Sequence, residues 1–335
     1  MMKVLVTGAA GFIGFHLSKK LLVEGYQVIG VDNLNDYYDP NLKLGRLKEL
    51  GIFGVDLEST KIKAYNSEGL TFLKSDIVDD ALWKLLAEKY QIDSIIHLAA
   101  QAGVRYSLEN PKAYIKSNVE GFLNVLEFCR HQEIQHLIYA SSSSVYGMDS
   151  KQPYQEDEAC NKPVSLYAAT KRSNELMAST YHHLYGIKSM GLRFFTVYGP
   201  WGRPDMAPYL FTKAAFGGKT IKVFNHGNQK RDFTYIDDII NGMLNIFKQK
   251  EKIEGAEICN IGQGNPVALM DFIESIEYTT EKELEKEFVD AQAGDVTVTF
   301  CDIGKLEVNY KYRPQIDLHS GIENFVFWFK DYYKL

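Results

Sequence analysis

The stretch "MKVLVTGAAGFIGFHL", residues 2–17, decides the fold class of this chain. Residues 3–8 are almost continuously apolar, as expected of a strand that is covered on both faces of a sheet. A helical pattern follows, and three glycines stand at the junction: Gly8, Gly11 and Gly14. Such glycines can serve tight packing alone, but they also let backbone N–H groups approach a pyrophosphate at a helix N-terminus.

An acidic residue at the end of the next apolar run favours the second interpretation. Asp32 stands where a carboxylate can accept both hydroxyls of an adenosine ribose. The same carboxylate would repel a 2′-phosphate. The strand, the glycines, the helix and Asp32 together predict a dinucleotide site that prefers NAD to NADP.

Apolar runs and helical patterns alternate through the first 200 residues. The further strands are expected at 27–33, 70–76, 93–100, 136–144 and 189–195, and the helices at 14–25, 80–90, 113–132 and 166–186. This alternation predicts an α/β fold, with a Rossmann-type doubly wound parallel sheet and right-handed crossovers. A polar segment, residues 34–69, interrupts the pattern.

Beyond residue 200 the alternation breaks at "YGPWGRPDMAP", and a short helix is expected around residues 209–218. We expect residues 232–249 and 257–262 to return to the main sheet, and the remainder to form a smaller mixed α/β C-terminal substrate lobe. The predicted domains are therefore an NAD-binding domain and a substrate-binding lobe. The first comprises residues 1–190 and 232–262, and the second residues 191–231 and 263–335.

Composition narrows the classes of partner. The net charge is −6 and the basic residues are scattered, which disfavours nucleic acid as a partner. No apolar run reaches the roughly 18–20 residues of a membrane span. The four cysteines have no metal-ligand spacing and indicate a reducing compartment. The glycines near the N-terminus and the lack of a cleavage site argue against a signal peptide, so we expect a cytoplasmic protein. We expect no metal site.

Four serines, a tyrosine and a lysine supply the expected chemistry. The sequence "ASSSSVYG" (140–147) follows the fifth strand, at the sheet edge where open α/β sheets hold ligands. Tyr167 and Lys171 stand one turn apart on the next helix, with Cβ atoms roughly 5–6 Å apart. A solvated helix face can carry such a pair by chance. Beside a nicotinamide ring, however, the ammonium would lower the pKa of the phenol, which could then take the proton of an alcohol.

The chain resembles the extended short-chain dehydrogenase/reductase superfamily, and more narrowly its NAD-dependent nucleotide-sugar epimerases. The segments that carry the broader resemblance are GxxGxxG at 8–14, "SNVEG" at 117–121, "SSSSVYG" at 141–147, YxxxK at 167–171 and "RDFTYIDD" at 231–238. Four further segments look like the UDP-glucuronate 4-epimerase branch: "DNLNDYYDP" (32–40), "QAGVRYSLENP" (101–111), "SLYAATK" (165–171) and "LRFFTVYGPWGRPDMA" (192–207).

The resemblance implies roles residue by residue. Tyr167 is the expected base, Lys171 its partner, which also holds the nicotinamide ribose, Ser142 the catalytic hydroxyl, and Asn118 the residue that fixes the active-site helix. The expected NAD-binding residues are Gly8, Ala10, Gly11, Phe12, Ile13, Gly14, Asp32, Asn33, Asn35, Asp76, Ile77, Leu98, Ala99, Ala100, Gln101, Asn118, Ser141, Tyr167, Lys171 and Phe194. The expected substrate-binding residues are Arg105, Ser142, Ser143, Ser144, Tyr167, Phe195, Thr196, Arg203, Val223, Phe224, Arg231 and Asp295.

Two features depart from the family pattern, and neither touches the expected chemistry. The segment around residues 46–70 is longer than usual, and Pro208 stands where an apolar side chain is expected. The family also implies a homodimer formed through helices such as 111–131 and 167–185.

The implied activity is the interconversion of UDP-glucuronate and UDP-galacturonate through a 4-keto sugar. Thr196, Arg203 and Arg105 are candidates for holding the substrate carboxylate. UDP-glucose or N-acetylhexosamine 4-epimerases, UDP-glucuronate decarboxylases, 4,6-dehydratases and a non-catalytic NAD sensor remain alternatives. An asparagine at the position of Thr196 would favour neutral hexoses, and a glutamate at the position of Ser144 would favour decarboxylation.

Overall fold

The computed structural model describes residues 1–148, 150–291 and 296–335. The chain divides into two compact units. The first unit comprises Met1–Val145, Cys160–Arg193 and Leu244–Cys259, and the second comprises Tyr146–Ala159, Phe194–Met243 and Asn260–Leu335. The domain boundaries given above stay a prediction. In the described part of the chain, no helix has the length and apolar character that crossing a membrane requires.

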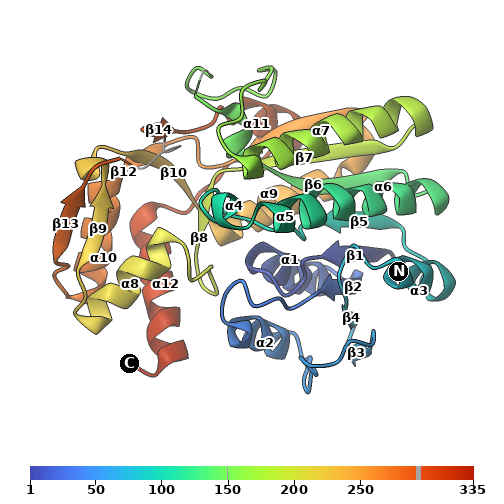
Figure 1. Ribbon diagram of the computed structural model, residues 1–335, viewed down its shortest axis with the longest axis horizontal. Helices are drawn as coiled ribbons and strands as arrows, with labels where there is room; N and C mark the ends of the chain where they lie inside the picture. Colours follow the sequence, from blue (N-terminus) through green and yellow to red (C-terminus); the bar gives the residue numbers. More distant parts are fainter. Residues whose placement is uncertain (149, 292–295) are drawn as a thin grey trace. The chain divides into compact units, whose positions relative to one another are not determined.

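An eight-stranded sheet forms the centre of the first unit (Figure 1). Its strand order is β11-β7-β6-β5-β1-β2-β4-β3. The strands are β1 (Lys3–Thr7), β2 (Gln27–Asp32), β3 (Ala64–Ser67), β4 (Leu70–Lys74), β5 (Ser94–His97), β6 (His136–Ser142), β7 (Lys188–Phe194) and β11 (Ala256–Ile261). β1 pairs in parallel with β2 on one side and with β5 on the other. The strand order therefore reverses at β1, which is the switch point where α/β sheets bind ligands.

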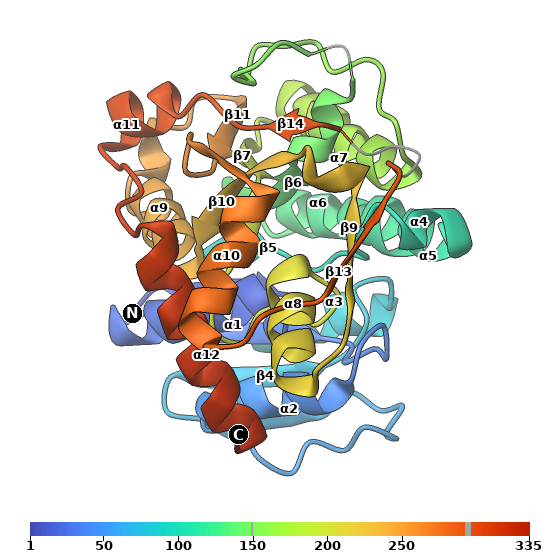
Figure 2. The same ribbon diagram turned by 90° about the vertical axis from the view of Figure 1, so that its left-hand side faces the viewer.

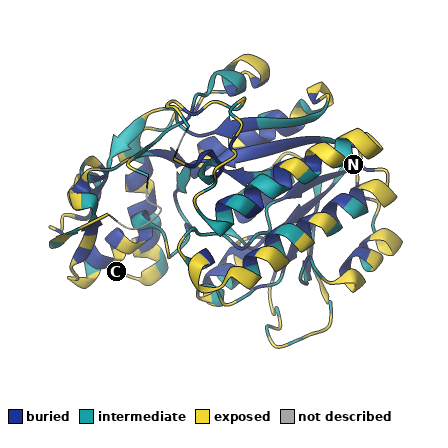
Figure 3. Ribbon diagram, turned by 45° about the horizontal axis from the view of Figure 1, so that its top comes forward, coloured by how far each residue is buried: buried dark blue, intermediate teal, exposed yellow. Residues whose placement is uncertain are grey.

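Helices cover this sheet, as the alternation in the sequence predicts. They are α1 (Phe12–Val23), α2 (Pro40–Glu49), α3 (Asp80–Lys89), α4 (Tyr106–Glu109), α5 (Pro111–Tyr114), α6 (Gly121–His131) and α7 (Leu166–Tyr185). Apolar side chains of α3, α6 and α7 join those of the central strands in one buried cluster. Figure 3 shows buried strands beneath helices whose outer faces are exposed. The Rossmann-type fold is confirmed.

The ends of these helices follow from local sequence. Ser165 caps α7, because its side chain accepts a hydrogen bond from the backbone N–H of Ala168. Gly186, with a φ of 72°, ends the same helix. The stretch 113–132, predicted as one helix, is divided by a π-helical segment, Ile115–Glu120.

The polar segment 34–69 contains regular structure. It holds α2, capped by Asp39, and the edge strand β3, which pairs antiparallel with β4. The strand β4 ends at Lys74 and β5 at His97, so both are shorter than the sequence pattern suggests.

The second unit is a mixed α/β lobe, as predicted. Its strands are β8 (Thr196–Tyr198), β9 (Ile221–Phe224), β10 (Lys230–Tyr235), β12 (Pro266–Ala268), β13 (Lys286–Val289) and β14 (Val298–Thr299). Its helices are α8 (Ala207–Gly217), α10 (Leu269–Thr280), α11 (Gly304–Tyr310) and α12 (Leu318–Tyr333), and α9 (Ile236–Lys248) runs from this unit into the first. Figure 2 shows α10 beside α8 and α12.

One expectation for this unit is revised by the strand pairing. β11 joins the main sheet as expected, but β10 pairs instead with β8, β12 and β14. An apolar run predicts that a strand forms, but it does not predict which other strand it pairs with. Pro208 lies in the first turn of α8, where proline is tolerated because the N–H that it lacks would have no partner within the helix.

Candidate active site

The glycine-rich turn is closed by backbone hydrogen bonds. The N–H groups of Gly8 and Ala9 donate to the carbonyl of Val31, at 2.7 and 3.1 Å. A Cβ at Gly14 would lie 2.1 Å from the carbonyl oxygen of Gly8, and a Cβ at Gly8 would lie 2.8 Å from the backbone nitrogen of Ala99. Glycine is therefore required at both positions. Backbone of this kind, at the start of α1, fits a pyrophosphate.

Asp32 lies beside this turn, as the sequence predicts. Its carboxylate accepts hydrogen bonds from the N–H of Ala10, at 3.2 Å, and of Leu34, at 2.9 Å. Two other predicted NAD-binding residues are also brought together, since the Asn33 amide donates to the Asp76 carboxylate at 3.2 Å.

A threonine and a histidine that the sequence analysis did not single out hold the loop after β5 against the turn. The hydroxyl oxygen of Thr7 accepts from the N–H groups of Leu98 and Ala99, both at 3.2 Å. Its own proton therefore goes to Nδ1 of His97, 2.7 Å away. Burial, and then the charge of Lys171, lower the pKa of His97 to about 3, so the ring is neutral and can accept. This arrangement fixes the predicted cofactor loop from Leu98 onward.

Lys171 is buried at the carboxyl end of β6. Its Nζ donates to the carbonyl of Ala140 at 2.8 Å. Desolvation lowers the pKa of this lysine to about 8. Ser142 ends the same strand, and its hydroxyl oxygen lies 2.9 Å from that of Ser144. The structure thus brings the predicted lysine and serines to one strand end.

Tyr167 lies one turn before Lys171 on α7, on the same face of the helix. Its ring packs edge-on against the buried ring of Tyr114, with centroids 6.0 Å apart. The backbone carbonyl of Tyr167 accepts from the hydroxyl of Thr170 at 2.8 Å. The roles of the serine, tyrosine and lysine stay predictions.

Asn118 connects the loop after β5 to α7. Its amide oxygen accepts from the N–H of Gln101 at 2.8 Å, and its amide nitrogen donates to the carbonyl of Gln101 and the hydroxyl of Thr170, both at 3.0 Å. The backbone carbonyl of Asn118 accepts from Asn174 at 2.6 Å. Asn118 lies within the π-helical segment, and such segments occur frequently at functional sites.

A buried ion-pair network lies behind the predicted site. Glu175, one turn after Lys171, accepts from the hydroxyl of Ser141 at 2.6 Å. It also accepts from Arg193, twice at 2.9 Å, and from Arg172 at 2.8 Å. Burial opposes the ionisation of Glu175, but these partners outweigh it and lower its pKa. The positions of Glu175 and Arg193 beside this site were not predicted from the sequence.

Two further basic residues were missed because they lie in the polar segment 34–69. Lys43 and Arg46 of α2 are both buried. Nζ of Lys43 donates to the side-chain oxygen of Asn35 at 2.9 Å, and Arg46 donates to the carbonyl of Ala10 at 2.9 Å. The segment therefore does reach the predicted cofactor site. A KxxR spacing beside the buried Leu42 and Leu47 was the available signal.

The remaining predicted substrate residues lie in both units. Arg105 precedes α4 in the first unit, and Arg203 pairs with Asp205 in the second, with a closest distance of 2.5 Å. The other predicted residues of the second unit are Phe194, Phe195, Thr196, Val223, Phe224 and Arg231, on or beside β7, β8, β9 and β10. Asp295 lies outside the described residues.

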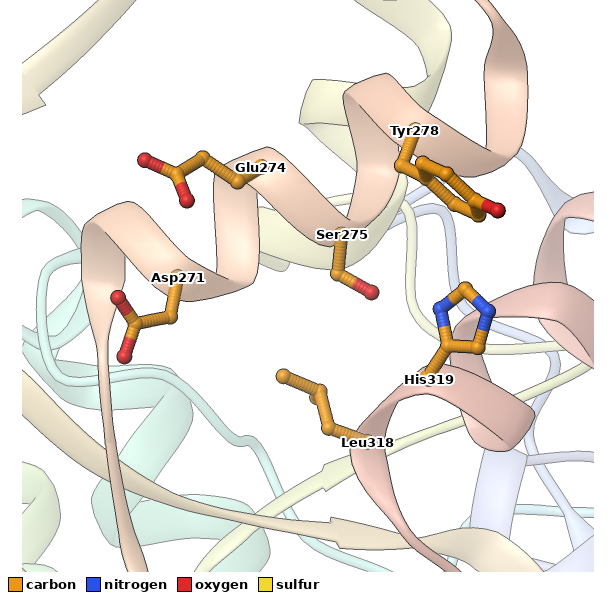
Figure 4. Close-up of a pocket in the computed structure, with 6 residues that line it drawn as sticks. All are labelled: Asp271, Glu274, Ser275, Tyr278, Leu318 and His319. Carbon is orange, nitrogen blue, oxygen red and sulfur yellow. The ribbon is translucent and has the colours of Figure 1, made fainter.

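A shallow depression between α10 and α12 contains none of the predicted residues. It is lined by Asp271, Glu274, Ser275, Tyr278, Leu318 and His319 (Figure 4).

Across the described ranges, no group of three or more histidine, cysteine, aspartate or glutamate side chains could hold a metal ion.

The glycine turn lies at the switch point of the sheet, and Asp32 ends β2. Ser142 ends β6, and Tyr167 and Lys171 lie on α7. This combination is typical of an extended short-chain dehydrogenase/reductase. The chain belongs to the NAD dependent epimerase/dehydratase family, whose model matches residues 4–262. It is therefore an enzyme with NAD as its cofactor.

Similar proteins cover nearly the whole chain. Protein CapI of Staphylococcus aureus is 46% identical, over 99% of this chain and 100% of its own length. UDP-glucuronate 4-epimerase 4 of Arabidopsis thaliana is 43% identical, over 98% of this chain and 76% of its own length. The crystal structure of UDP-glucuronic acid 4-epimerase from Bacillus cereus, in complex with UDP-glucuronic acid and NAD, is 35% identical, with a TM-score of 0.87. That similarity covers 99% of this chain and 100% of the other.

Proposed function

We propose that this NAD-dependent nucleotide-sugar 4-epimerase interconverts UDP-glucuronate and UDP-galacturonate. The observation that carries the proposal is similarity along nearly the whole chain, at 35–43% identity, to UDP-glucuronate 4-epimerases from a bacterium and a plant. The serines at positions 142–144 support it, because they leave no acidic side chain directly after the expected catalytic hydroxyl.

The side chains would act on the 4-hydroxyl of the sugar. Tyr167, as the phenolate, removes the hydroxyl proton, and the ammonium of Lys171 favours that ionised form. Ser142 donates a hydrogen bond that positions the same hydroxyl. NAD, held at the glycine-rich turn and Asp32, would supply the hydride acceptor and donor for carbon 4 of the sugar. Proton and hydride are both restored, so the cycle is redox-neutral.

Inversion needs the 4-keto sugar to present its other face before the hydride returns. We assign the anchoring of the uridine diphosphate to Arg231 and Asp295, so that the hexose can turn about its link to the diphosphate. The guanidinium of Arg231 is held by the carbonyls of Lys230, at 3.0 Å, and Thr297, at 3.1 Å.

The substrate carboxylate creates a specific hazard. Oxidation at carbon 4 gives a β-keto acid, which can lose carbon dioxide when the bond to the carboxylate aligns with the ketone. An epimerase must therefore hold that carboxylate out of alignment. We assign this role to Thr196 and Arg203, with Arg105 as a third candidate, because an arginine can bind a carboxylate through two parallel hydrogen bonds.

The alternatives differ in the expected product. Ser144 disfavours a decarboxylase, which would have a glutamate at this position, and Thr196 disfavours an epimerase of neutral hexoses, which would have an asparagine. A non-catalytic NAD sensor would have no need of the Ser142, Tyr167 and Lys171 set.

One incubation separates these activities. Purified protein is mixed with UDP-glucuronate, without added NAD, and the products are resolved by chromatography. UDP-galacturonate supports the proposal. UDP-xylose, a keto sugar, or no turnover on this substrate would each overturn it, and parallel incubation with UDP-glucose tests the neutral-hexose alternative.

We also propose that the protein is a homodimer, formed through α6 and α7. The exposed apolar side chains Leu123 on α6, and Leu176 and Leu184 on α7, support this surface. Light scattering of the purified protein should give twice the chain mass, and the double variant Leu176→Glu, Leu184→Glu should give the monomer mass. An unchanged mass in that variant would exclude this surface.

A further inference from the structure

A buried lysine faces the carboxylate that is expected to bind the adenosine ribose. Lys43 is 5% exposed, and its Nζ lies 3.5 Å from Oδ1 of Asp32 and 2.9 Å from the side-chain oxygen of Asn35. An ammonium has three N–H donors. Asn35 and Asp32 are the acceptors that the described residues provide, which leaves one donor for an oxygen of a ligand.

The surroundings of Lys43 hold it in this position. The Tyr38 ring lies beneath two cations, with its centroid 5.4 Å from Nζ of Lys43 and 5.5 Å from the guanidinium carbon of Arg46. Arg46, one turn further along α2, donates to the hydroxyl of Tyr38 at 2.7 Å and to the carbonyl of Ala10 in the glycine-rich turn. Helix α2 is thereby fastened to both ends of the predicted dinucleotide cradle, the glycine turn and Asp32.

Burying a lysine is costly unless the charge is compensated, and among the described residues Asp32 is the carboxylate paired with this ammonium. That carboxylate is already engaged by the N–H groups of Ala10 and Leu34. The Asp32–Lys43 pair is therefore close to neutral, whereas a lone aspartate at the end of β2 would carry an uncompensated negative charge.

We propose that Lys43 is a cofactor-binding residue that sets the selectivity between NAD and NADP. Its ammonium offsets the carboxylate of Asp32 and offers its remaining donor to the substituents of the adenosine ribose. A 2′-phosphate, with a charge of about −1.5 to −2, is then repelled less than by a lone aspartate. The site consequently binds NADP more tightly than a site with Asp32 and no nearby lysine would. This inference concerns the cofactor and does not depend on which sugar the enzyme accepts.

The test is a competition between the two nucleotides. The purified holoenzyme is dialysed to equilibrium against mixtures of NAD and NADP in the absence of sugar. The bound nucleotides are then released and quantified, which gives the ratio of the two dissociation constants without an apo-protein. We expect Lys43→Met to shift this ratio toward NAD by at least about tenfold, because a unit charge acts strongly on a nearby phosphate in a partly buried site.

Lys48→Met is the matched control. It removes the same charge from an exposed position on the same helix, and its ratio should stay within about twofold of the wild-type value. If Lys43→Met does not fold, Lys43→Gln removes the charge while keeping an N–H donor for Asn35, and the same shift is expected. A folded charge-removing variant whose ratio stays within twofold of the wild type, or moves toward NADP, overturns the proposal.

Discussion

Glu175 and Arg193 form a buried ion pair joined by two hydrogen bonds of 2.9 Å, and their side chains are 2% and 1% exposed. Glu175 lies on α7, one turn beyond Lys171, and Arg193 lies on β7. Because Glu175 also accepts from the hydroxyl of Ser141, the pair holds the strand end that carries Ser142. The ion pair therefore helps to hold the end of β6, where the predicted catalytic Ser142 lies.

Breaking this pair should destabilise the fold. Arg193→Met leaves the Glu175 carboxylate buried with Arg172 as its remaining ionic partner, and we expect a loss of about 3–5 kcal/mol in the free energy of unfolding. Urea denaturation measures it. The double variant Glu175→Gln, Arg193→Met removes the stranded charge and should recover part of the loss. Equal stability of Arg193→Met and the wild type would contradict the assigned role.

The same pair should make stability depend on pH. The partners of Glu175 lower the pKa of its carboxylate in the folded protein. The ionised carboxylate therefore stabilises the fold fully above its unfolded pKa of about 4.3. This contribution is lost as the pH falls through the lower pKa of the folded protein. Between pH 5 and pH 3 the wild type should therefore lose more stability than Glu175→Gln. Parallel urea titrations at these pH values compare the two, and identical losses would count against the lowered pKa.

The turn after β1 should tolerate no side chain at position 14. In Gly14→Ala the new Cβ would lie 2.1 Å from the carbonyl oxygen of Gly8, so the turn must open. We expect this variant to be purified without bound NAD, as measured by nucleotide release and absorbance. Gly217→Ala, where the added Cβ makes one ordinary contact at 3.8 Å, should retain NAD like the wild type. Full NAD content in Gly14→Ala would show that the turn is not the cradle.

The sequence predicted the parts of the fold that rest on local pattern. Sequence pattern predicted the glycine turn, Asp32 and the alternating strands and helices. Periodic apolar residues mark strands and helices, and glycines mark places where backbones approach closely. The sequence could not reveal the π-helical segment around Asn118, because a shift of backbone hydrogen bonds needs no special residue. Lys43 was overlooked because a lysine in a polar segment is usually exposed to solvent. The predicted placement of β10 in the main sheet was wrong because tertiary packing, and not the local sequence, determines strand partners.

Removing the phenol should separate chemistry from binding. Tyr167→Phe keeps the ring that packs against Tyr114 but loses the expected base, so turnover should fall by about 10²–10⁴. NAD content after purification should be unchanged. Tyr185→Phe, an exposed position on the same helix, is the control and should turn over like the wild type. Wild-type turnover in Tyr167→Phe would remove this tyrosine from the mechanism.

Turnover should also depend on the protonation of Lys171. With a pKa of about 8, the ammonium loses its proton as the pH rises through that value, and the phenolate then loses its stabilising charge. We expect turnover to fall above about pH 8 in the wild type. Lys171→Arg, which stays charged, should move this limb to higher pH if it retains activity.

The titration of Lys171 does not itself destabilise the fold in this range. Because burial puts the folded pKa of Lys171 below the unfolded value of about 10.4, the stability contributed by this group rises with pH between the two values. Rates measured at saturating substrate across pH 6–10, with Tm recorded on the same samples, test both statements. A wild-type rate that is flat across this range would contradict the role of Lys171.

The fate of the hydrogen on carbon 4 tests the central claim most directly. UDP-glucuronate carrying deuterium at carbon 4 is incubated with the purified enzyme, without added NAD, and the UDP-galacturonate formed is analysed by mass spectrometry and NMR. Hydride removal and return within one site predicts a product that keeps its deuterium at carbon 4. A product with solvent hydrogen at that carbon, or the absence of UDP-galacturonate, would contradict the account.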